Sequence, residues 1–373
     1  MTAPVPAAAP MNILVIRLDF LGDMICTTPL LAALRREYPE ARLCVLATRY
    51  NRVALAGNTD VDEIFTYVYS RQPERNERPG KLRALWDRLC LVRRLRKERF
   101  DLVVIPNGGR NQGSITFAHQ LGARRIVFRD RETEFDDRNP EHVASRTIEH
   151  EALSGFRLLD LPPERHGPLH LKLVADPARL AAQSWSPGPP VVGLFVTARD
   201  PARIWPTAHW ATLARALAET GGAAEGGPLR VAILWSPGRP DQPFIRGDDA
   251  QADTLRQALA GLPNVHFVPT PTVDDLIAVA ANLDLAVTPD GAPVHICAAL
   301  DRPVVALFEN RREKTGRWYP LGVPQRLVTA TAEAGGTSVG DIAPEAVLAA
   351  VQALLQESVR KRAAGRAAAT APS

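Results

Sequence analysis

Short apolar runs alternate along this chain with longer segments of helical spacing, and this alternation constrains the fold more than any other feature. The runs hold four to six residues and are often bounded by Gly, Pro, Asn or Asp, as expected of parallel strands buried on both faces. The predicted strands are Ile13–Leu18, Leu43–Thr48, Leu102–Pro106, Arg125–Phe128, Val191–Val196, Val231–Trp235, Val265–Pro269, Leu285–Thr288 and Val304–Phe308.

Helical patterns fill the intervals between these strands. They are Leu30–Tyr38, Lys81–Arg99, Ile148–Leu159, Ala208–Thr220, Ala250–Ala260, Val273–Asn282, Val294–Ala299 and Ala343–Arg360. Repeated strand–helix–strand units predict an α/β protein with doubly wound, Rossmann-like parallel sheets.

The length of 373 residues and two Pro/Gly clusters indicate two such domains. The clusters, at 161–168 and 184–190, precede a new strand–helix series. We expect an N-terminal domain over 11–175 and a C-terminal domain over 188–330, facing each other across a cleft that holds the ligands. A helix over 343–362 is expected to pack across both. The Ala/Pro-rich stretches 1–10 and 363–373 are expected to be a disordered leader and a disordered tail.

Composition excludes several classes of protein. Apolar residues make up 46% and charged residues 23%, with a net charge of +4, so neither a disordered acidic chain nor a uniformly basic coat protein is indicated. No run of about eighteen apolar residues occurs, so a membrane-spanning helix is not expected. Four scattered cysteines without metal-ligand spacing predict reduced thiols rather than disulfides or structural zinc. With no secretory signal pattern, we expect a cytoplasmic protein.

The first candidate motif follows the first strand. Gly22 would allow a tight turn beyond the strand, and Asp23 would then lie where a general base could lie. An equally good interpretation is that Asp23 only caps a helix. That helix begins either at Thr28–Pro29 or near Gly22, with a kink at Pro29. The pattern GxGxxG is absent, so the turn is not a dinucleotide fingerprint.

The second motif is the polar loop after the strand ending near Thr197. Arg199 and Arg203 lie in it, and Pro206 opens a helix. A threonine hydroxyl, backbone amides and cations at a helix start form an anion site, in which Arg203 could hold a diphosphate. A solvated Arg/Asp loop is the alternative.

The third motif is a strand, the turn Asp290–Pro293 and a helix with His295. Gly291 would let a backbone amide approach a phosphate closely. The carboxylate of Asp290 suits a hydroxyl-rich sugar or ribose rather than a phosphate. His295 could donate to a phosphate, or it could be an ordinary core histidine.

Together and in this order, the motifs resemble glycosyltransferase family 9, the ADP-heptose:lipopolysaccharide heptosyltransferases. The matching elements are R-L-x-x-L-G-D with a Thr-Pro before the helix, R-x-W-P-x-x-H-W, T-P-D-G-x-x-x-H-I-x-A-A-L-x-x-P-V-V-A-L-F, and the later R-W-Y-P-L-G. The resemblance extends from Met11 to about Val328. It implies a GT-B fold and an inverting transferase that carries a sugar, most simply heptose from ADP-heptose, onto a lipopolysaccharide-core or other envelope glycan.

The resemblance also implies roles for individual residues. Asp23 matches the catalytic aspartate, Arg203 the phosphate-contacting basic residue, and Asp290 the donor-binding acid, with His295 at the expected spacing. The chain departs from the family at three places. Asp241 is the only acid in the loop segment SPGRPDQ after the strand Val231–Trp235, the turn Gly291-Ala292-Pro293 is unusual, and Phe20 and Cys26 replace small or polar residues.

Inverting transfer needs a base on the acceptor hydroxyl and neutralisation of the leaving diphosphate. We expect Asp23 to be the base. The expected donor-binding residues are Thr197, Arg199, Arg203, Asp290, Gly291 and His295, with the backbone amides near Gly291 and Val294. The acceptor side is assigned to Arg17, Gly22 and Asn107, which lie at strand tips or beside them. No DxD-like motif precedes the donor site, so we expect neither a metal ion nor another cofactor to be required.

A basic segment adds a prediction about partners. Residues 71–100 contain eleven lysines and arginines against four acids, a local balance of +7. Within Lys81–Arg99 the apolar residues Leu82, Leu85, Trp86, Leu89 and Val92 fall near one helical face. This stripe either packs on the domain's own sheet or contacts an anionic membrane surface or a phosphorylated glycolipid. Nucleic acid is not expected, because no aromatic-interleaved basic strand occurs.

Two other functions fit the same pattern. One is a sugar-nucleotide epimerase of similar fold, which would need no acceptor. The other is a non-catalytic sugar-nucleotide-binding relative in envelope assembly, against which the joint presence of Asp23, Arg203 and Asp290 argues.

Overall fold

The computed structural model forms two compact units, residues 1–174 and 175–373. It describes residues 11–78, 80–129, 148–220, 229–239, 247–331 and 337–370, without the side chains of 220 and 358–370. The predicted leader 1–10 lies outside the described residues.

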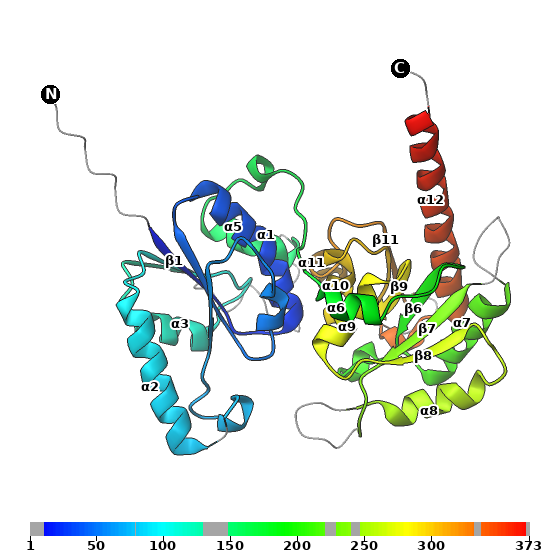
Figure 1. The fold of residues 1–373 in the computed structure, drawn as a ribbon, viewed down its shortest axis with the longest axis horizontal. Coiled ribbons are helices and arrows are strands. Elements are labelled where there is room, and N and C mark those ends of the chain that lie inside the picture. The colour runs from blue at the N-terminus through cyan, green and yellow to red at the C-terminus, as the bar shows by residue number, and fades with distance from the viewer. Residues whose placement is uncertain are drawn as a thin grey trace. The chain divides into compact units, whose positions relative to one another are not determined.

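The first unit is built on a five-stranded sheet in which every strand pairing is parallel. The strand order is β3-β2-β1-β4-β5. Figure 1 labels β1, the central strand of this sheet. The strands are β1 (Asn12–Arg17), β2 (Arg42–Ala47), β3 (Glu63–Thr66), β4 (Leu102–Ile105) and β5 (Arg125–Phe128).

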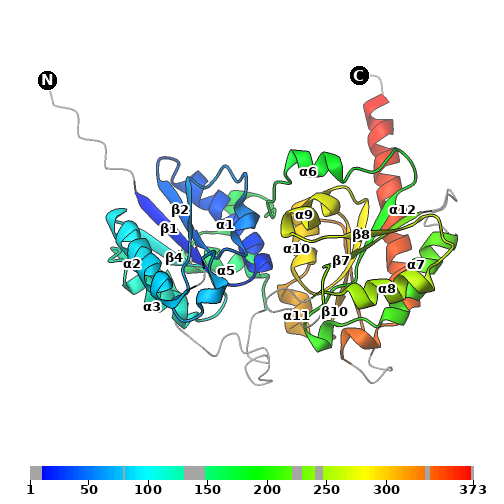
Figure 2. The same ribbon diagram turned by 60° about the horizontal axis from the view of Figure 1, so that its bottom comes forward.

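Helices cover both faces of this sheet. Side chains of α2 (Lys81–Lys97) and α3 (Gln112–His119) pack on the face that carries Leu14 and Ile16. On the other face lie α1 (Leu21–Glu37) and α5 (Ser154–Leu158), which contact each other (Figure 2). Within its described residues the unit also contains the 3-10 turns η1 (Arg52–Leu55), η2 (Pro73–Arg75), η4 (Glu151–Leu153) and η5 (Pro163–His166).

The second unit contains a six-stranded parallel sheet of order β11-β10-β9-β6-β7-β8. Counted within the unit, this is the doubly wound order 3-2-1-4-5-6 of dinucleotide-binding domains. The strands are β6 (Val191–Phe195), β7 (Arg230–Trp235), β8 (Val265–Pro269), β9 (Leu285–Pro289), β10 (Val304–Phe308) and β11 (Gln325–Thr329).

One face of the second sheet packs against α7 (Thr207–Thr220), α8 (Asp249–Ala258) and α12 (Pro344–Thr370). α10 (Ala292–Ala299) contacts β9, β10 and α9 (Val273–Ala281), which in turn contacts α6 (Pro177–Ala182). The remaining short elements are α11 (Arg312–Arg317), η6 (Pro201–Arg203) and η8 (Val339–Asp341).

All nine predicted strands are present, and two strands were not predicted. The additional strands β3 and β11 lie at sheet edges, where a one-sided environment gives mixed sequences instead of continuous apolar runs. The short helices α3, α6 and α11 also went unpredicted, because they have too few turns to show a period.

The first helix begins at Leu21, so the alternative start near Gly22 is correct and Gly22 lies in its first turn. Pro29 lies inside the helix and cannot donate to the carbonyl of Ile25. The Thr28 hydroxyl donates to that carbonyl at 2.7 Å instead. The sequence thus tolerates the proline because the preceding threonine replaces the missing donor.

The last helix, α12, extends past the boundary predicted at 362 and continues to Thr370, into the stretch expected to be disordered. Alanine, which dominates this stretch, has the highest intrinsic helix propensity. The N-terminal half of α12 packs within the second unit, where Val347, Val351 and Leu354 are fully buried. Among the described helices, none combines the length and the apolar character that crossing a bilayer requires.

Candidate active site

Each sheet has a switch point, where two adjacent strands lead their connections in opposite directions. In the first unit this point lies between β1 and β4, and in the second between β6 and β9. Open α/β sheets bind ligands beyond the carboxyl ends of strands at such points. Most of the predicted site residues follow these four strands.

Asp23 lies in the first turn of α1, and both its oxygens have partners. The backbone N–H of Phe20 donates to its Oδ2 at 3.2 Å, and Nη2 of Arg17 donates to its Oδ1 at 2.6 Å. The helix-capping interpretation therefore describes a real contact. The side chain remains 15% exposed, so the carboxylate is held in place yet open to a ligand.

Arg17, at the end of β1, is a cation in the middle of three carboxylates. Its side chain is only 2% exposed. Nη2 contacts Glu151 at 2.7 Å as well as Asp23, Nε lies 3.2 Å from Asp19, and Nη1 donates to the carbonyl of Pro106 at 3.0 Å. Burial alone would lower the pKa of Arg17, and the three carboxylates together reverse this and raise it.

Burial is also the largest influence on Asp23, and it raises the pKa of this carboxyl. The charge of Arg17 acts in the opposite direction, while the charges of Asp19 and Glu151 raise the pKa further. Because Arg17 is shared among three acids, its charge does not fully offset the burial of Asp23. Asp23 is therefore a stronger base than a free aspartate.

Asn107 follows β4 and contacts the same cluster. Its Nδ2 donates to Asp19, which also accepts from Asn111 at 2.9 Å. Its Oδ1 is buried and makes no hydrogen bond within the described part of the chain. Of the predicted acceptor residues, the structure thus gathers Arg17, Gly22 and Asn107 around Asp23.

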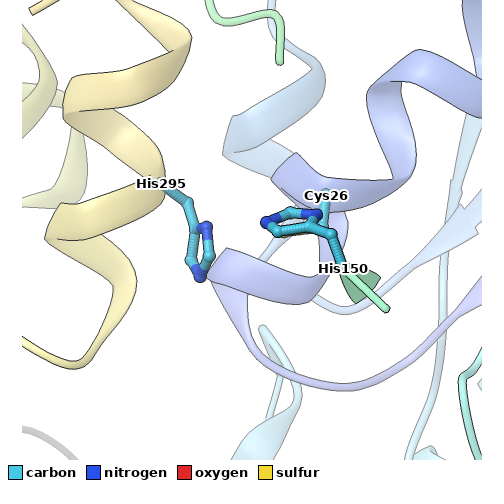
Figure 3. A group of neighbouring side chains, drawn as sticks. All are labelled: Cys26, His150 and His295. Carbon is cyan, nitrogen blue, oxygen red and sulfur yellow. The ribbon is translucent and has the colours of Figure 1, made fainter. Parts of the chain in front are cut away.

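Glu151 comes from a different part of the chain, and the sequence analysis missed it. Its Oε1 also accepts from the N–H of Gly108 at 3.2 Å. The neighbouring His150 caps η4, accepting from the N–H of Ala152 at Nδ1. Figure 3 shows His150 beside Cys26 of α1. A ring nitrogen of His150 lies within 4.8 Å of the Cys26 Sγ. η4 packs against α1, the helix that carries Asp23.

In the second unit, Arg203 of η6 meets the turn after β9. Its Nε lies 3.3 Å from Oδ2 of Asp290, and Nη1 donates to the Asp290 carbonyl at 3.5 Å. Glu309 lies 3.9 Å from the same Nε. The Arg203 side chain is 27% exposed, so it can also contact a ligand.

Asp290 is buried, and this burial is the main reason why its pKa is raised. The charges of Arg203 and Lys314 oppose the shift, and that of Glu309 adds to it. Lys314 of α11 and Glu309 therefore belong to this site. Neither was predicted, although both precede the R-W-Y-P-L-G segment that resembles the family.

Thr197 and Arg199 meet at Asp248, which the sequence analysis also missed. The Thr197 hydroxyl donates to Asp248 at 2.7 Å, and Nη1 of Arg199 contacts both oxygens at 2.8 and 2.9 Å. Asp248 donates its backbone N–H to Ser236, directly after β7. An acid, Asp248, therefore lies at the carboxyl end of β7. The acid noted in the sequence, Asp241, lies outside the described residues.

His295 on α10, labelled in Figure 3, is buried. Its ring lies 5.9 Å from that of Trp318. Gly291 has an extended backbone, which any residue can adopt. The value of this glycine therefore lies in the space that its missing side chain leaves, and not in a special backbone conformation. The N–H of Val294, expected to bind phosphate, donates to the Gly291 carbonyl at 3.1 Å.

Two tryptophans of the second motif have a structural role. Trp205 and Trp210 are fully buried, with ring centroids 4.6 Å apart. Trp205 donates to the carbonyl of Ile342 at 2.9 Å, which fixes the loop that carries Arg203.

The chemistry of the two units differs. The first offers a partly exposed carboxylate of raised basicity, and the second offers cations beside acids that suit a sugar or ribose. A proton acceptor and an anion-binding group are the two requirements of glycosyl transfer from a nucleotide sugar.

Comparisons with known proteins agree with this assignment. The family model described as glycosyltransferase family 9 (heptosyltransferase) matches residues 88–340. Lipopolysaccharide heptosyltransferase 2 of Salmonella typhimurium is 26% identical, and the alignment covers 93% of this chain and 99% of the relative. The protein of the same name from Escherichia coli K12 is 27% identical, with 92% and 99% covered.

Solved structures share the fold. A family 9 glycosyltransferase from Veillonella parvula superposes with a TM-score of 0.71 at 16% identity, covering 94% of this chain and 98% of the other. Escherichia coli ADP-heptose heptosyltransferase II gives 0.65 at 22% identity, with 92% and 98% covered.

The two doubly wound units and these neighbours define the GT-B fold, as predicted. The chain belongs to glycosyltransferase family 9, the heptosyltransferase family, and the resemblance drawn from its motifs is confirmed.

Proposed function

We propose that the protein is an inverting heptosyltransferase that moves heptose from ADP-heptose onto a lipopolysaccharide-core or related envelope glycan. Family membership and the names of the relatives support the sugar and the acceptor class. The observation that carries the chemistry is the Asp23 carboxylate at the switch point of the first unit, fixed by Arg17 and still partly exposed.

In this reaction an acceptor hydroxyl attacks the anomeric carbon of the donor. Its oxygen forms the new glycosidic bond while the bond from that carbon to the diphosphate oxygen breaks. Asp23 takes the hydroxyl proton, and a positioned base of this kind contributes about 10²–10⁴-fold to the rate. Asn107, whose buried Oδ1 has no partner in the described structure, can accept a hydrogen bond from the acceptor.

The leaving diphosphate needs positive charge and hydrogen-bond donors. We assign this task to Arg203 and Arg199, with the Thr197 hydroxyl and the backbone near Gly291. Asp290 holds Arg203 in the free protein and can turn to sugar hydroxyls when the diphosphate shares the guanidinium. His295, buried beside Trp318, is assigned to the same donor site.

The function is tested by incubating the protein with ADP-heptose and heptose-free lipopolysaccharide core. We expect a heptosylated product with inverted anomeric configuration, and no donor consumption without the acceptor. A thermal-shift screen of ADP-, GDP-, UDP- and dTDP-sugars should favour the ADP-sugar. Donor consumption without acceptor would favour an epimerase, and donor binding with no turnover across an acceptor panel would favour a non-catalytic relative.

We also propose that α2 contacts the anionic membrane surface in which a glycolipid acceptor resides. Leu82, Leu85, Trp86 and Leu89 are exposed, and Leu82 is exposed to 85%. The predicted stripe therefore does not pack on the unit's own sheet; Val92 alone of its members is half-buried against the core. An exposed apolar stripe beside cations is the pattern of an interfacial helix.

The opposite face of α2 fixes this orientation. Ala84 and Leu95 are buried, and the guanidinium of Arg88 lies 4.1 Å from the ring centre of Phe117 and 4.4 Å from that of Tyr67. Because these contacts hold the inner face on the sheet, the apolar stripe stays on the outside. Arg93 and Lys97 are also exposed, so that positive charge accompanies the stripe.

Flotation with anionic and neutral vesicles tests this contact. We expect binding to anionic vesicles that weakens with salt and is lost in the double variant Leu82→Ser/Trp86→Ser. Leu327→Ser, which removes an exposed leucine from β11 in the other unit, should bind like the parent protein. Equal binding by all three proteins, or binding indifferent to lipid charge, would exclude the proposal.

A further inference from the structure

Glu151 is a buried acid that no substrate needs to touch, yet it shares a guanidinium with the proposed base. Its side chain is 1% exposed. Arg17 Nη2 lies 2.7 Å from Glu151 Oε1 and 2.6 Å from Asp23 Oδ1, so a single nitrogen bridges the two carboxylates.

The rest of the cluster restricts Glu151 and Arg17 to these places. The N–H of Gly108 donates to the same Oε1, and the carbonyl of Pro106 accepts from Arg17 Nη1. Asp19 lies against Nε of Arg17. The guanidinium is therefore held on three sides by groups other than Asp23, and it cannot turn towards Asp23 alone.

A guanidinium that belonged to Asp23 alone would strongly stabilise its ionised form and make it a poor proton acceptor. Competition from Glu151 and Asp19 reduces this effect. Their negative charges also disfavour ionisation of Asp23 directly, in agreement with the raised pKa of Asp23. The geometry fixes the orientation of the base, and the excess of acids preserves its basicity.

We propose that Glu151 is a positioning residue, which fixes Arg17 between three carboxylates and thereby sets the direction and the basicity of Asp23. This inference rests on the proposed function of Asp23. Arg17, predicted to touch the acceptor, then acts on the acceptor side through Asp23 rather than by direct contact.

The charged groups facing Asp23 in this unit are Arg17, Asp19 and Glu151. His150 lies nearby on the Cys26 side of α1. In Glu151→Gln, the amide oxygen can still accept from Arg17, but one negative charge is gone. The pKa of Asp23 should therefore fall for two reasons. A neighbouring negative charge is removed, and Arg17 is then shared by fewer carboxylates.

The test is the pH dependence of kcat in Glu151→Gln, Glu151→Asp and the parent enzyme. We expect the acid limb of Glu151→Gln to move down by roughly half to one pH unit, and its plateau to fall several-fold because a weaker base remains. Glu151→Asp retains the charge but shortens the reach, so it should lose rate with an unmoved acid limb. NMR titration of labelled aspartate carboxyl carbons should show the same shift without turnover.

Glu63→Gln is the matched control, because Glu63 is likewise a glutamate that accepts from arginine in this unit. Its partners, Arg42 and Arg94, lie away from the switch point. It should leave the profile unchanged. An acid limb of Glu151→Gln equal to the parent's would overturn the inference. If Asp23→Asn retains the parent rate, the proposed base itself fails, and this outcome is distinct from an unmoved profile with an inactive Asp23→Asn.

If Glu151→Gln does not fold, Glu151→Asp still tests the positioning. Retention of the full parent rate by that variant would overturn the inference.

Discussion

The key aspartates of the two units have similar surroundings. Asp23 and Asp290 are each buried enough to have a raised pKa, and each lies against an arginine, Arg17 and Arg203. The arginines differ in exposure, at 2% and 27%. The buried arginine is suited to orienting a base, and the accessible arginine is suited to binding an anion.

Asp248 should determine how well the donor binds. Asp248→Asn removes the carboxylate that Thr197 and Arg199 both contact, and each such charged hydrogen bond contributes about 1.5–3 kcal/mol. We expect the KM for the donor to rise roughly tenfold or more while kcat changes little. Steady-state kinetics with varied donor measure this.

Asp253→Asn provides the control for that prediction. Asp253 pairs with the exposed Arg256 within α8, the helix that begins directly after Asp248. It should leave the donor KM unchanged. An unchanged KM in Asp248→Asn would mean that Thr197 and Arg199 do not depend on this acid for their role.

The site residues proposed from the sequence lie in loops or helix starts that follow strands. Asp23, Arg203 and Asp290 could be proposed because βα loops at a switch point are the expected ligand sites. Glu151 and Asp248 could not, because their roles depend on contacts across long stretches of chain: Glu151 lies 134 positions from Arg17, and Asp248 lies 51 positions from Thr197. No local spacing encodes such pairs.

At the scale of elements, α1 positions the proposed base. It carries Asp23 in its first turn and tolerates Pro29 because the Thr28 hydroxyl donates to the carbonyl of Ile25. The same hydroxyl accepts from the N–H of Lys172 at 2.9 Å, which ties a distant segment to this helix. The buried Thr28 side chain is thus a junction between two parts of the unit.

Thr28→Val should therefore destabilise the first unit. The substitution preserves shape but leaves the Ile25 carbonyl and the Lys172 N–H without their partner, at a cost of about 1–3 kcal/mol. Thr27→Val is the matched control, because the Thr27 hydroxyl donates to the Asp23 carbonyl, which the regular helix already pairs. Urea unfolding should show a clearly lower midpoint for Thr28→Val, and equal midpoints would contradict this account.

Strand prediction succeeded for the buried central strands and for the edge strands β5 and β8, and it failed at the other two edges, β3 and β11. The central strands β1 and β6 are continuous apolar runs with no exposed residue. Edge strand β3 contains an exposed Ile64 and a charged Glu63 in four residues, which gives no period to detect. The fold class depends on the central strands, so it could be predicted although β3 and β11 could not.

For the whole molecule, neutralisation of the leaving group by arginines predicts activity without a metal ion. In the proposed mechanism, Arg199 and Arg203 supply the positive charge on the leaving diphosphate, a task that a divalent cation can also perform. Adding a chelator to the transfer assay should leave kcat and the donor KM largely unchanged. Loss of activity with EDTA that returns with a divalent cation would contradict this prediction.

The most direct test of the central claim is the transfer rate of Asp23→Asn, measured together with its affinity for the donor. We predict a rate lower by about 10²–10⁴-fold, with an unchanged dissociation constant for the nucleotide sugar, because the amide keeps the shape but cannot accept the proton. A folded, donor-binding Asp23→Asn protein that transfers heptose at the parent rate would contradict the account.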